Sequence, residues 1–347
     1  QKNYYFCAMN RDFAPDNRWF AIVNPVSGKG HGLRDWPQIS SLLDAAGVAV
    51  DALFTLYKYH ATELVVRAIN QGYRKIIIMG GDGTIHEAIN GLFIQKIVPS
   101  AEVTFAVIAV GTGNDWVRMF GISRNYTEAI RSITDGVTFL QDVGRVSYTE
   151  SQVPQVRYMA NVGGVAYDAA VCRSFNRLKE RGYRGSWLYI RAAIKNAITY
   201  RCKHTTVVAD GNTIFDGKMF TASAAIGKYS GGGLSQTPLA IPDDGLFDMT
   251  IIPKMNRLKL FFRFGALFNE NIYNISRIEL HRAANINISS NPPTSLELDG
   301  ETLGLSDFSF SIIPKSYSDH CGQELYCCPK LVEFFNVCLI CDICLSS

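Results

Sequence analysis

Residues 75–92 read KIIIMGGDGTIHEAINGL, and this stretch decides the fold. The apolar run Lys75–Met79 is followed at once by glycines and then by apolar residues at helical spacing, which predicts a strand, a tight turn and a helix. Thr84 has the side chain of a helix N-cap. Glycine lets backbone N–H groups approach a phosphate closely, and the N-terminus of the next helix adds positive potential. The stretch therefore predicts a phosphate-binding turn that contains one acid, Asp82.

Two more glycine turns follow apolar runs in the first half of the chain. Trp19–Val23 leads into Asn24-Pro25-Val26-Ser27-Gly28-Lys29-Gly30, and Val103–Val110 leads into Gly111-Thr112-Gly113-Asn114-Asp115. The first of these is not a Walker loop, because it lacks the spacing G-x-x-x-x-G-K-[ST]. Each turn alone fits an ordinary loop between a strand and a helix. The three together predict a polyphosphate at the carboxyl ends of parallel strands.

The hydrophobic pattern changes near Val137, which predicts two domains. Before this point strand and helix patterns alternate, as in a doubly wound α/β domain, here over residues 17–140. After it, short alternating runs separated by Asp-Gly and Asn-Pro turns predict a mostly antiparallel β domain over residues 141–315. Residues 316–347 form a Cys-rich C-terminal extension. Its Cys338, Cys341 and Cys344 have metal-ligand spacing, although a plain terminal extension is the simpler interpretation.

The composition is that of a globular protein with a sizeable core, since 47% of the 347 residues are apolar and 19% are charged. A net charge of +3 is too small to favour nucleic acid, so we expect no nucleic-acid partner. We expect no transmembrane helix, because no apolar run reaches 18 residues. Cys7, Cys172 and Cys202 are scattered as in a reduced, cytoplasmic protein. The chain begins with Gln1, which leaves open a segment upstream.

The ordered set of glycine and acidic motifs resembles the diacylglycerol kinase catalytic family, the lipid kinases that include the sphingosine kinases. The resemblance runs from about Trp19 to Pro314. It rests on the three turns together with Asp142-Val143-Gly144, Asp244-Gly245-Leu246-Phe247-Asp248 and Leu298-Asp299-Gly300-Glu301. The element Gly-Gly-Asp-Gly-Thr alone is shared with phosphofructokinases and NAD kinases. The resemblance implies a phosphofructokinase-like or NAD-kinase-like first domain, a β-sandwich after it, and an active site in the cleft between them.

The residues predicted to bind the nucleotide lie mainly in the three turns, where backbone amides can hold phosphates. Lys29 could add a point charge, although an exposed loop lysine is the alternative. The resemblance implies a nucleotide or metal contact for Glu87, where stabilisation of the helix dipole competes as an explanation. The full set is Asn24, Pro25, Ser27, Gly28, Lys29, Gly30, Gly80, Gly81, Gly83, Thr84, Glu87, Gly111, Thr112, Gly113, Asn114, Asp115 and Glu301.

Phosphoryl transfer needs a base for the attacking hydroxyl and a metal ion that neutralises phosphate charge. The resemblance assigns the general base to an aspartate in one of two signatures, and the sequence does not decide between Asp82 and Asp299. Asp168 matches an aspartate that contacts the lipid head group in sphingosine kinases, so we expect it to contact substrate.

A further acidic group is a candidate metal site. Asp243, Asp244 and Asp248 lie within six residues of one another, and three carboxylates suit a hard cation with oxygen ligands. The resemblance implies a structural Mg²⁺ near this loop in bacterial members of the family. A solvated acidic turn is the alternative.

The prediction for function is an ATP- and Mg²⁺-dependent kinase that phosphorylates a lipid hydroxyl of a diacylglycerol or sphingoid-like acceptor. The substrate lies in a membrane, so we expect a cytoplasmic protein with peripheral membrane contact, and a homodimer is a further possibility. An amphipathic helix near residues 257–268 is the predicted docking surface. Two alternatives stay open: an NAD kinase-like enzyme acting on a small metabolite, and a nucleotide-binding regulatory protein without catalysis.

Overall fold

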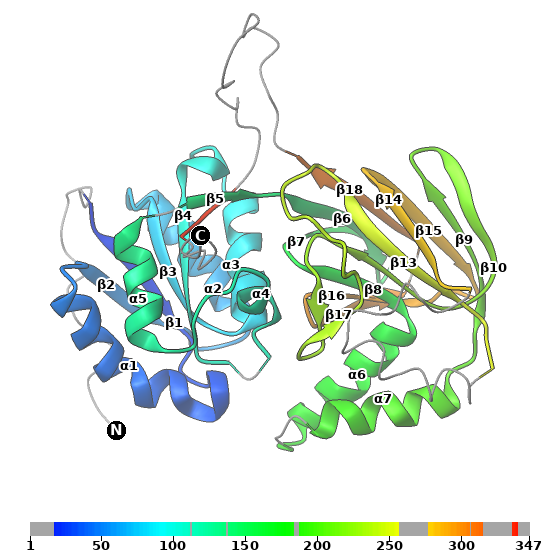
Figure 1. Ribbon diagram of the computed structural model, residues 1–347, viewed down its shortest axis with the longest axis horizontal. Helices are drawn as coiled ribbons and strands as arrows, with labels where there is room; N and C mark the ends of the chain where they lie inside the picture. Colours follow the sequence, from blue (N-terminus) through cyan, green and yellow to red (C-terminus); the bar gives the residue numbers. More distant parts are fainter. Residues whose placement is uncertain are drawn as a thin grey trace, which may run out of the picture. The chain divides into compact units, whose positions relative to one another are not determined.

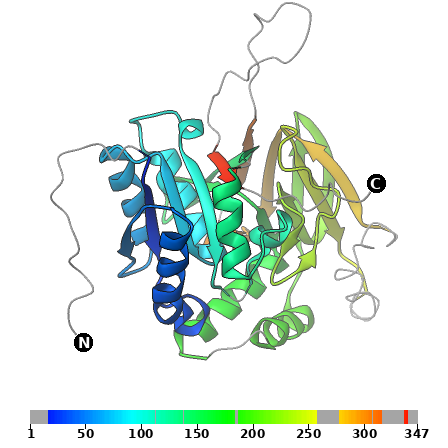
Figure 2. The ribbon, with the colours of Figure 1, turned by 60° about the vertical axis from the view of Figure 1, so that its left-hand side comes forward.

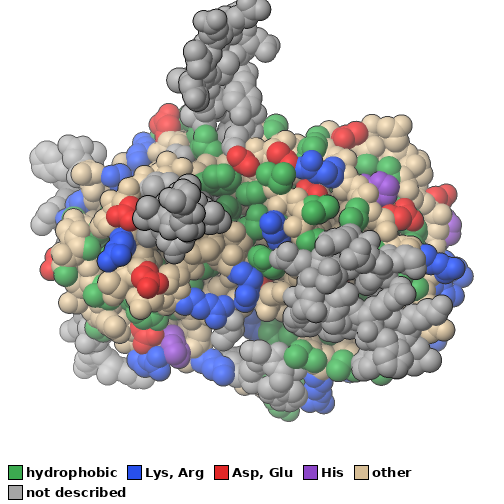
Figure 3. Space-filling view, viewed as in Figure 1, with side chains coloured by type: hydrophobic (Ala, Val, Ile, Leu, Met, Phe, Trp, Pro, Cys, Tyr) green, Lys and Arg blue, Asp and Glu red, His purple; other side chains and the backbone are tan. Residues whose placement is uncertain are grey.

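The computed structural model describes residues 17–111, 113–136, 138–183, 187–256, 277–305 and 307–314, together with one strand at 335–338. The chain divides into two compact units, which we describe separately. The first unit ends at Gln141 and includes the strand from the tail, and the second runs from Asp142 to Ser316. Acidic and basic side chains are mixed over the face shown in Figure 3. None of the helices in these described ranges is long and apolar enough to cross a bilayer.

The first unit is built on a sheet with the strand order β2-β1-β3-β4-β19-β5 among the described residues (Figure 1). The first four of these strands are parallel to one another, so their carboxyl ends lie at one edge. Their bounds are β1 Trp19–Val23, β2 Val50–Phe54, β3 Lys75–Gly80, β4 Thr104–Ala109, β5 Thr138–Gln141 and β19 Phe335–Cys338.

Helices cover both faces of this sheet, which explains why strands such as Ile76–Met79 are buried throughout. Helices α1 and α5 pack on one face, where Ile39 and Ile130 join the core, and α2 and α3 lie on the other face (Figure 2). The helices are α1 Ser27–Ala45, α2 His60–Asn70, α3 Asp82–Ile94, α4 Asp115–Met119 and α5 Tyr126–Asp135, with a short 3₁₀ turn at Ser100–Glu102. The predicted doubly wound α/β fold is confirmed.

The sequence pattern gave no signal for β19, the strand contributed by the tail. It lies between β4 and β5, parallel to the first and antiparallel to the second (red in Figures 1 and 2). The backbone of Phe335–Cys338 thereby extends the sheet. The other cysteines of the predicted C-terminal extension lie outside the described residues.

The second unit is mostly antiparallel β structure, as the pattern of short alternating runs predicts. Its described strands follow the order β17-β16-β8-β10-β9-β15-β18-β6-β7, and β13 pairs with both β10 and β14. Their bounds are β6 Val143–Glu150, β7 Val153–Met159, β8 Val162–Ala166, β9 Lys203–Ala209, β10 Asn212–Ala225, β13 Phe247–Pro253, β14 Glu279–Ala283, β15 Asn285–Asn291, β16 Ser295–Leu298, β17 Glu301–Leu305 and β18 Phe308–Ile313. A small hairpin adds β11 Tyr229–Ser230 and β12 Leu234–Ser235.

The curled sheet of this unit has two apolar surfaces. One encloses a large core that includes Phe247, Leu298 and Phe310. The other packs against helices α6, Tyr167–Glu180, and α7, Trp187–Thr199, around Tyr167 and Phe220. The predicted β-sandwich architecture is confirmed as a two-layered, curled antiparallel sheet.

Gly28 provides a test of how closely the first turn packs on the sheet. Gly28, Lys29 and Gly30 all have left-handed backbones, and a Cβ on Gly28 would lie 1.8 Å from the carbonyl oxygen of Val110. We therefore expect Gly28→Ala to lower the free energy of unfolding by about 2 kcal/mol or more, measured by denaturant titration. Gly47→Ala is the matched control, because Gly47 has φ +72° but no atom within 4 Å of its Cβ position. Equal losses in both variants would contradict the packing argument.

Candidate functional site

The three glycine turns of the first unit meet at the carboxyl edge of its parallel sheet. Asn24 joins the first turn to the second, because its Nδ2 donates to Thr84 Oγ1 at 2.9 Å and its backbone N donates to Met79 O at 2.9 Å. Thr84 thus holds the Asn24 side chain and is not seen to cap α3, whose N-cap position is Gly81. The predicted grouping of these turns is therefore present in the folded unit.

The turns approach one another through backbone atoms. A Cβ on Gly81 would lie 3.2 Å from Gly111 Cα, and a Cβ on Gly111 would lie 2.8 Å from Gly81 Cα. Ser27 Oγ is also near, at 3.8 Å from the Cβ position of Gly81. Side chains at these positions would push the turns apart, so the glycines are required for the arrangement itself as well as for ligand approach.

Asp82 opens α3 and ties the second turn to the third. Its Oδ1 accepts the backbone N–H of Trp116 at 3.1 Å, at the start of α4. Its Oδ2 lies 3.0 Å from the position that a Cβ on Gly113 would take. The half-buried carboxylate is thus fixed among the glycine turns, where it can act on a ligand through its charge.

Asn114 carries a buried acceptor beside the same turns. It adopts a left-handed backbone, is 2% exposed, and donates from Nδ2 to Gly111 O at 2.7 Å. Its Oδ1 has no hydrogen-bond donor among the described residues and lies 3.3 Å from the Cβ position of Gly81. A buried carbonyl oxygen without a donor costs free energy, so a ligand hydroxyl or a water is the fitting partner.

Of the remaining predicted nucleotide residues, Lys29 and Asp115 belong to these turns and Glu87 lies on α3, whereas Glu301 begins β17 in the second unit. Lys29 is exposed, and buried Asp115 begins α4 with Oδ1 4.0 Å from Arg118 Nε. Glu87 has a local structural contact, because its Oε2 accepts the N–H of Ala61 at the start of α2 at 3.2 Å. Thr112 lies outside the described residues. The nucleotide roles of these residues stay predictions.

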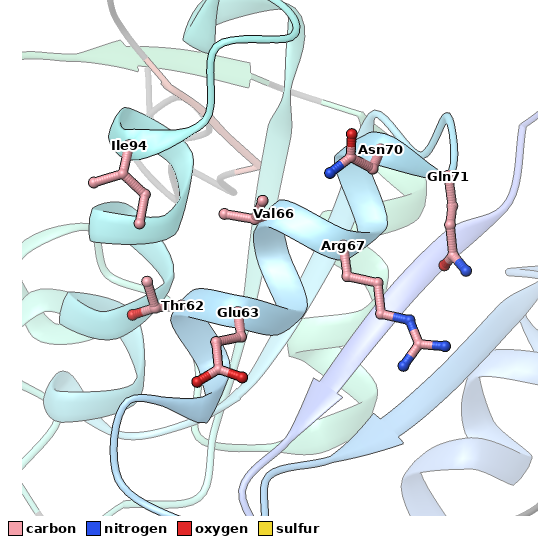
Figure 4. Close-up of a pocket in the computed structure, with 7 residues that line it drawn as sticks. All are labelled: Thr62, Glu63, Val66, Arg67, Asn70, Gln71 and Ile94. Atoms are coloured by element: carbon pink, nitrogen blue, oxygen red, sulfur yellow. The ribbon is translucent and has the colours of Figure 1, made fainter.

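A shallow hollow of about 430 Å³ lies along α2 (Figure 4), and its wall residue Thr62 donates to Glu87 O at 2.8 Å. None of the residues predicted to bind nucleotide is among those that line it. Its walls are Thr62, Glu63, Val66, Arg67, Asn70, Gln71 and, from α3, Ile94.

In the second unit, Asp299 binds the backbone at the start of strand β8, and we call this set of hydrogen bonds the Asp299 clamp. Its Oδ1 accepts the N–H groups of Asn161 and Val162, and its Oδ2 accepts that of Ala160, each at 3.1 Å. Both oxygens of the carboxylate are therefore engaged by backbone donors. Its left-handed backbone, φ +49°, turns the chain from β16 into β17.

A buried polar cluster lies on the helix-covered side of the same sheet. Gly164 on β8 is paired directly with Ser223 on β10 and with Glu297 on β16. Gly164 leaves a space there, since a Cβ would lie 2.7 Å from Glu297 Oε1 and 2.9 Å from Asp168 Cβ. Ser223 Oγ lies within hydrogen-bond distance of Asp168 Oδ2, at 3.2 Å, and of Gln236 Oε1, at 2.6 Å.

The two carboxyl groups of this cluster titrate unusually. Burial raises the pKa of Asp168 to about 6, while hydrogen bonds from Thr221 and Ser223 oppose that rise. Burial also raises the pKa of Glu297 well above its usual range, the N–H of Gly300 opposes this, and the charge of Asp168 adds to it. Strongly perturbed carboxyls in one place are typical of functional sites.

Helix α6 aligns this cluster with the Asp299 turn. Cys172 Sγ and Asn176 Nδ2, one helical turn apart, both donate to Gly300 O, at 2.9 and 3.1 Å. The N–H of Gly300 in turn donates to Glu297 Oε2 at 2.9 Å. Sequence reasoning predicted Asp168 but missed Glu297, Ser223 and Cys172. The one available signal was the alternation in β16, which places the polar Ser295 and Glu297 on the face opposite Leu296 and Leu298.

The predicted cation site at Asp243, Asp244 and Asp248 is not supported by the geometry. Within the described ranges no three His, Cys, Asp or Glu side chains are grouped so that they could hold a metal ion. Arg282 pairs with Asp244 and, at 3.4 Å, with Asp248, so a guanidinium lies where the prediction places Mg²⁺. This acidic loop is therefore an ion-pair network rather than a metal cage.

Comparison with known protein families gives a match for each of the two units. The diacylglycerol kinase catalytic domain matches residues 18–146, and the YegS C-terminal NAD kinase beta sandwich-like domain matches residues 161–318. The chain therefore belongs to the diacylglycerol kinase catalytic-domain family.

Individual relatives are distant but cover most of the chain. The YtlR protein of Bacillus subtilis, provisionally named a lipid kinase, is 28% identical over 314 residues, which are 86% of this chain and 97% of that protein. A diacylglycerol kinase of the same species is also 28% identical, over 82% of this chain and 89% of its own. A crystal structure of a Bacillus anthracis diacylglycerol kinase shares the fold at a TM-score of 0.65 and 20% identity, covering 93% of this chain and 97% of its own.

The clamp by Asp299 predicts a large stability effect. In Asp299→Asn one acceptor oxygen becomes an amide donor that faces the N–H groups of Ala160–Val162, so we expect a loss of roughly 3 kcal/mol in the free energy of unfolding. Asp216→Asn is the control, since that side chain is 59% exposed. A variant at position 299 as stable as the control would show that the clamp contributes little.

Burial of Asp168 predicts a pH-dependent effect on stability. Its folded pKa of about 6 lies above the usual 3.8, so the folded state holds the proton more tightly and loses stability as pH rises from about 4 through 6. Asp168→Asn resembles the neutral acid and escapes this loss. We expect the variant to gain roughly 2–3 kcal/mol relative to wild type between pH 4 and pH 8, measured by urea titration. A difference independent of pH would contradict the raised pKa.

Proposed function

We propose that this protein is a lipid kinase that transfers the γ-phosphoryl group of ATP to a lipid hydroxyl with Mg²⁺. The observation that carries the proposal is the convergence of three glycine turns on Asp82 at the edge of a parallel sheet. Phosphoryl transfer depends mainly on held phosphates and placed charge, which such an arrangement supplies.

Each part of the first unit has a role in this proposal. The backbones of Asn24–Gly30 and Gly80–Thr84 hold phosphates, and the buried Asn114 Oδ1 accepts from a nucleotide hydroxyl or a bound water. The Mg²⁺ brought by the nucleotide would be held mainly by its phosphates and by water, and it would neutralise phosphate charge. The acidic loop at Asp244 has no part in this, because Arg282 already pairs with it.

The second unit supplies the acceptor side. Half-buried Asp168 and buried Glu297, both beside Gly164, orient the polar head of the lipid through hydrogen bonds. We assign proton acceptance to Asp82 in preference to Asp299, because both Asp299 oxygens already accept backbone N–H groups. Asp299 then acts by fixing the strand that carries Gly164.

Two other functions compete. An NAD kinase-like enzyme would use the same Gly80–Thr84 turn with a small-metabolite acceptor, and a regulatory protein would bind ATP without turnover. Incubation with labelled ATP and either NAD or a total lipid extract, followed by mass spectrometry of the labelled product, separates the three. Labelled lipid supports the proposal, labelled NADP supports the first alternative, and ATP binding without product supports the second.

Asp82→Asn tests the catalytic assignment. Asparagine keeps the shape and an acceptor for the Trp116 N–H but removes the charge, so we expect at least a 10²-fold loss of turnover with little change in stability. Labelled phosphate transfer to lipid measures the rate, and circular dichroism checks the fold. Asp44→Asn, at an exposed position of α1, is the control and should retain full activity. Near-normal turnover in folded Asp82→Asn would remove Asp82 from the mechanism.

A further inference from the structure

Gln141 is a buried glutamine at the end of strand β5, where it is the last residue of the first unit. The residue is 1% exposed, and its Oε1 accepts the indole N–H of Trp116 at 2.9 Å. A buried amide is costly unless it is hydrogen-bonded, and an apolar side chain would fill the same space without that cost. The choice of glutamine at this position therefore points to the hydrogen bond with the indole.

Trp116 also carries the backbone N–H that Asp82 accepts. The residue is 2% exposed, its indole donates to Gln141, and its backbone N donates to Asp82 Oδ1 at 3.1 Å. We call these two hydrogen bonds the Trp116 bridge. The bridge connects the buried amide of Gln141 to the carboxylate that lies among the glycine turns.

Helix α4 depends on this anchor because it is short. It has five residues, and a helix of that length has little stability of its own. Its N-cap residue, Asn114, makes no side-chain capping hydrogen bond. The Trp116 ring packs on Phe120 with ring centroids 4.7 Å apart, and Gln141 fixes the rotation of the indole. The position of the Trp116 backbone N–H consequently depends on how the side chain of the same residue is held.

We propose that Gln141 is a positioning residue for phosphoryl transfer, because it holds Trp116 so that the backbone N–H of Trp116 keeps Asp82 in one orientation. The inference rests on the proposed function, in which Asp82 accepts the proton of the attacking hydroxyl. With Oδ1 held by this N–H, Oδ2 lies beside Gly113 among the turns. A group that accepts a proton must be directed at the reacting hydroxyl, and a misplacement of about 1 Å can lower the rate roughly 10²-fold.

Labelling of the tryptophans with ¹⁵N tests the bridge without a kinase assay. The chain has four tryptophans, so each N–H signal of Trp116 can be assigned by its loss in Trp116→Phe. Gln141→Met keeps the length of the side chain but removes the acceptor oxygen. We expect the Trp116 indole signal to shift, and the Trp116 backbone N–H to exchange with solvent at least about tenfold faster than in wild type. An unchanged exchange rate of this backbone N–H would overturn the proposal, because the effect of Gln141 would then end at the indole.

Kinase kinetics test whether the bridge acts on the reaction. We expect Gln141→Met to lower kcat at least about fivefold and to change the KM for ATP less than about twofold, because the turns that hold the phosphates keep their residues. In a Trp116→Phe background, which already lacks the indole N–H, the same change should lower kcat less than about twofold further. Losses of equal size in both backgrounds would overturn a role that acts through Trp116.

Gln95→Met is the matched control. Gln95 is also a buried glutamine of the first unit, 8% exposed, and it makes hydrogen bonds with Ile97 and Val98. It follows the C-terminal end of α3, whereas Asp82 lies at the N-terminal end of that helix. We expect Gln95→Met to lower the thermal stability but to keep kcat within about twofold of wild type. A loss of kcat that follows the loss of stability in both variants would overturn the proposal.

The two kinds of measurement separate this inference from the proposed function. If the wild type transfers no phosphate to lipid while the Trp116 backbone N–H responds to Gln141→Met, the proposed function fails and the link between Gln141 and Asp82 stands. If lipid is phosphorylated and Gln141→Met has the kcat of the wild type, the positioning role fails and the proposed function stands.

Discussion

Close contact between backbones, with no side chains between them, is the constraint on which the candidate nucleotide site depends. Gly28 lies against the Val110 carbonyl, and Gly81 lies so close to Gly111 that a Cβ would clash on Gly111 and be crowded on Gly81. This contact places Asp82 against the start of α4 and leaves the Asn114 side chain buried beside the turns. The glycines set the distance between the turns. A substitution at one of them would therefore change the packing of the sheet edge and the position of Asp82 together.

The second unit contains three carboxyl groups, Asp168, Glu297 and Asp299, which differ in the hydrogen-bond donors around them. Asp299 accepts three backbone N–H groups, which tie the turn between β16 and β17 to the start of β8. Asp168 and Glu297 have weaker compensation, so burial dominates and raises the pKa of both. One carboxylate is therefore structural, and the other two retain a cost of burial. The same residue type serves two purposes because the neighbouring donors differ.

The sequence predicted most elements of the first unit, because β1, β3 and β4 each lead into a glycine turn and α2, α3 and α5 have a clear apolar period. It also predicted that Asp82, Asn24 and Gly111 would meet, because parallel strands bring their carboxyl ends to one edge. The sequence did not predict contacts between residues that are far apart in the chain. Strand register decides that Glu297 lies beside Gly164, and a distant guanidinium, Arg282, replaces the predicted metal ion at Asp244. The predicted docking helix near residues 257–268 lies outside the described residues.

Helix α7 shows why a pattern of hydrophobic residues alone cannot identify the buried face of a helix. Its sequence has apolar residues on both sides, and the period of 3.6 fits a stripe through Ala192 and Ala193 and the stripe through Ile190 and Ile194 equally well. Hydrogen bonds from Tyr167 and Asn196 select the smaller residues as the inner face, since alanine allows the two helices to approach closely. The larger residues are then left outside, which is the reverse of the order expected from hydrophobicity. The residues of α6 therefore decide which stripe of α7 is buried, and the sequence of α7 alone does not contain that information.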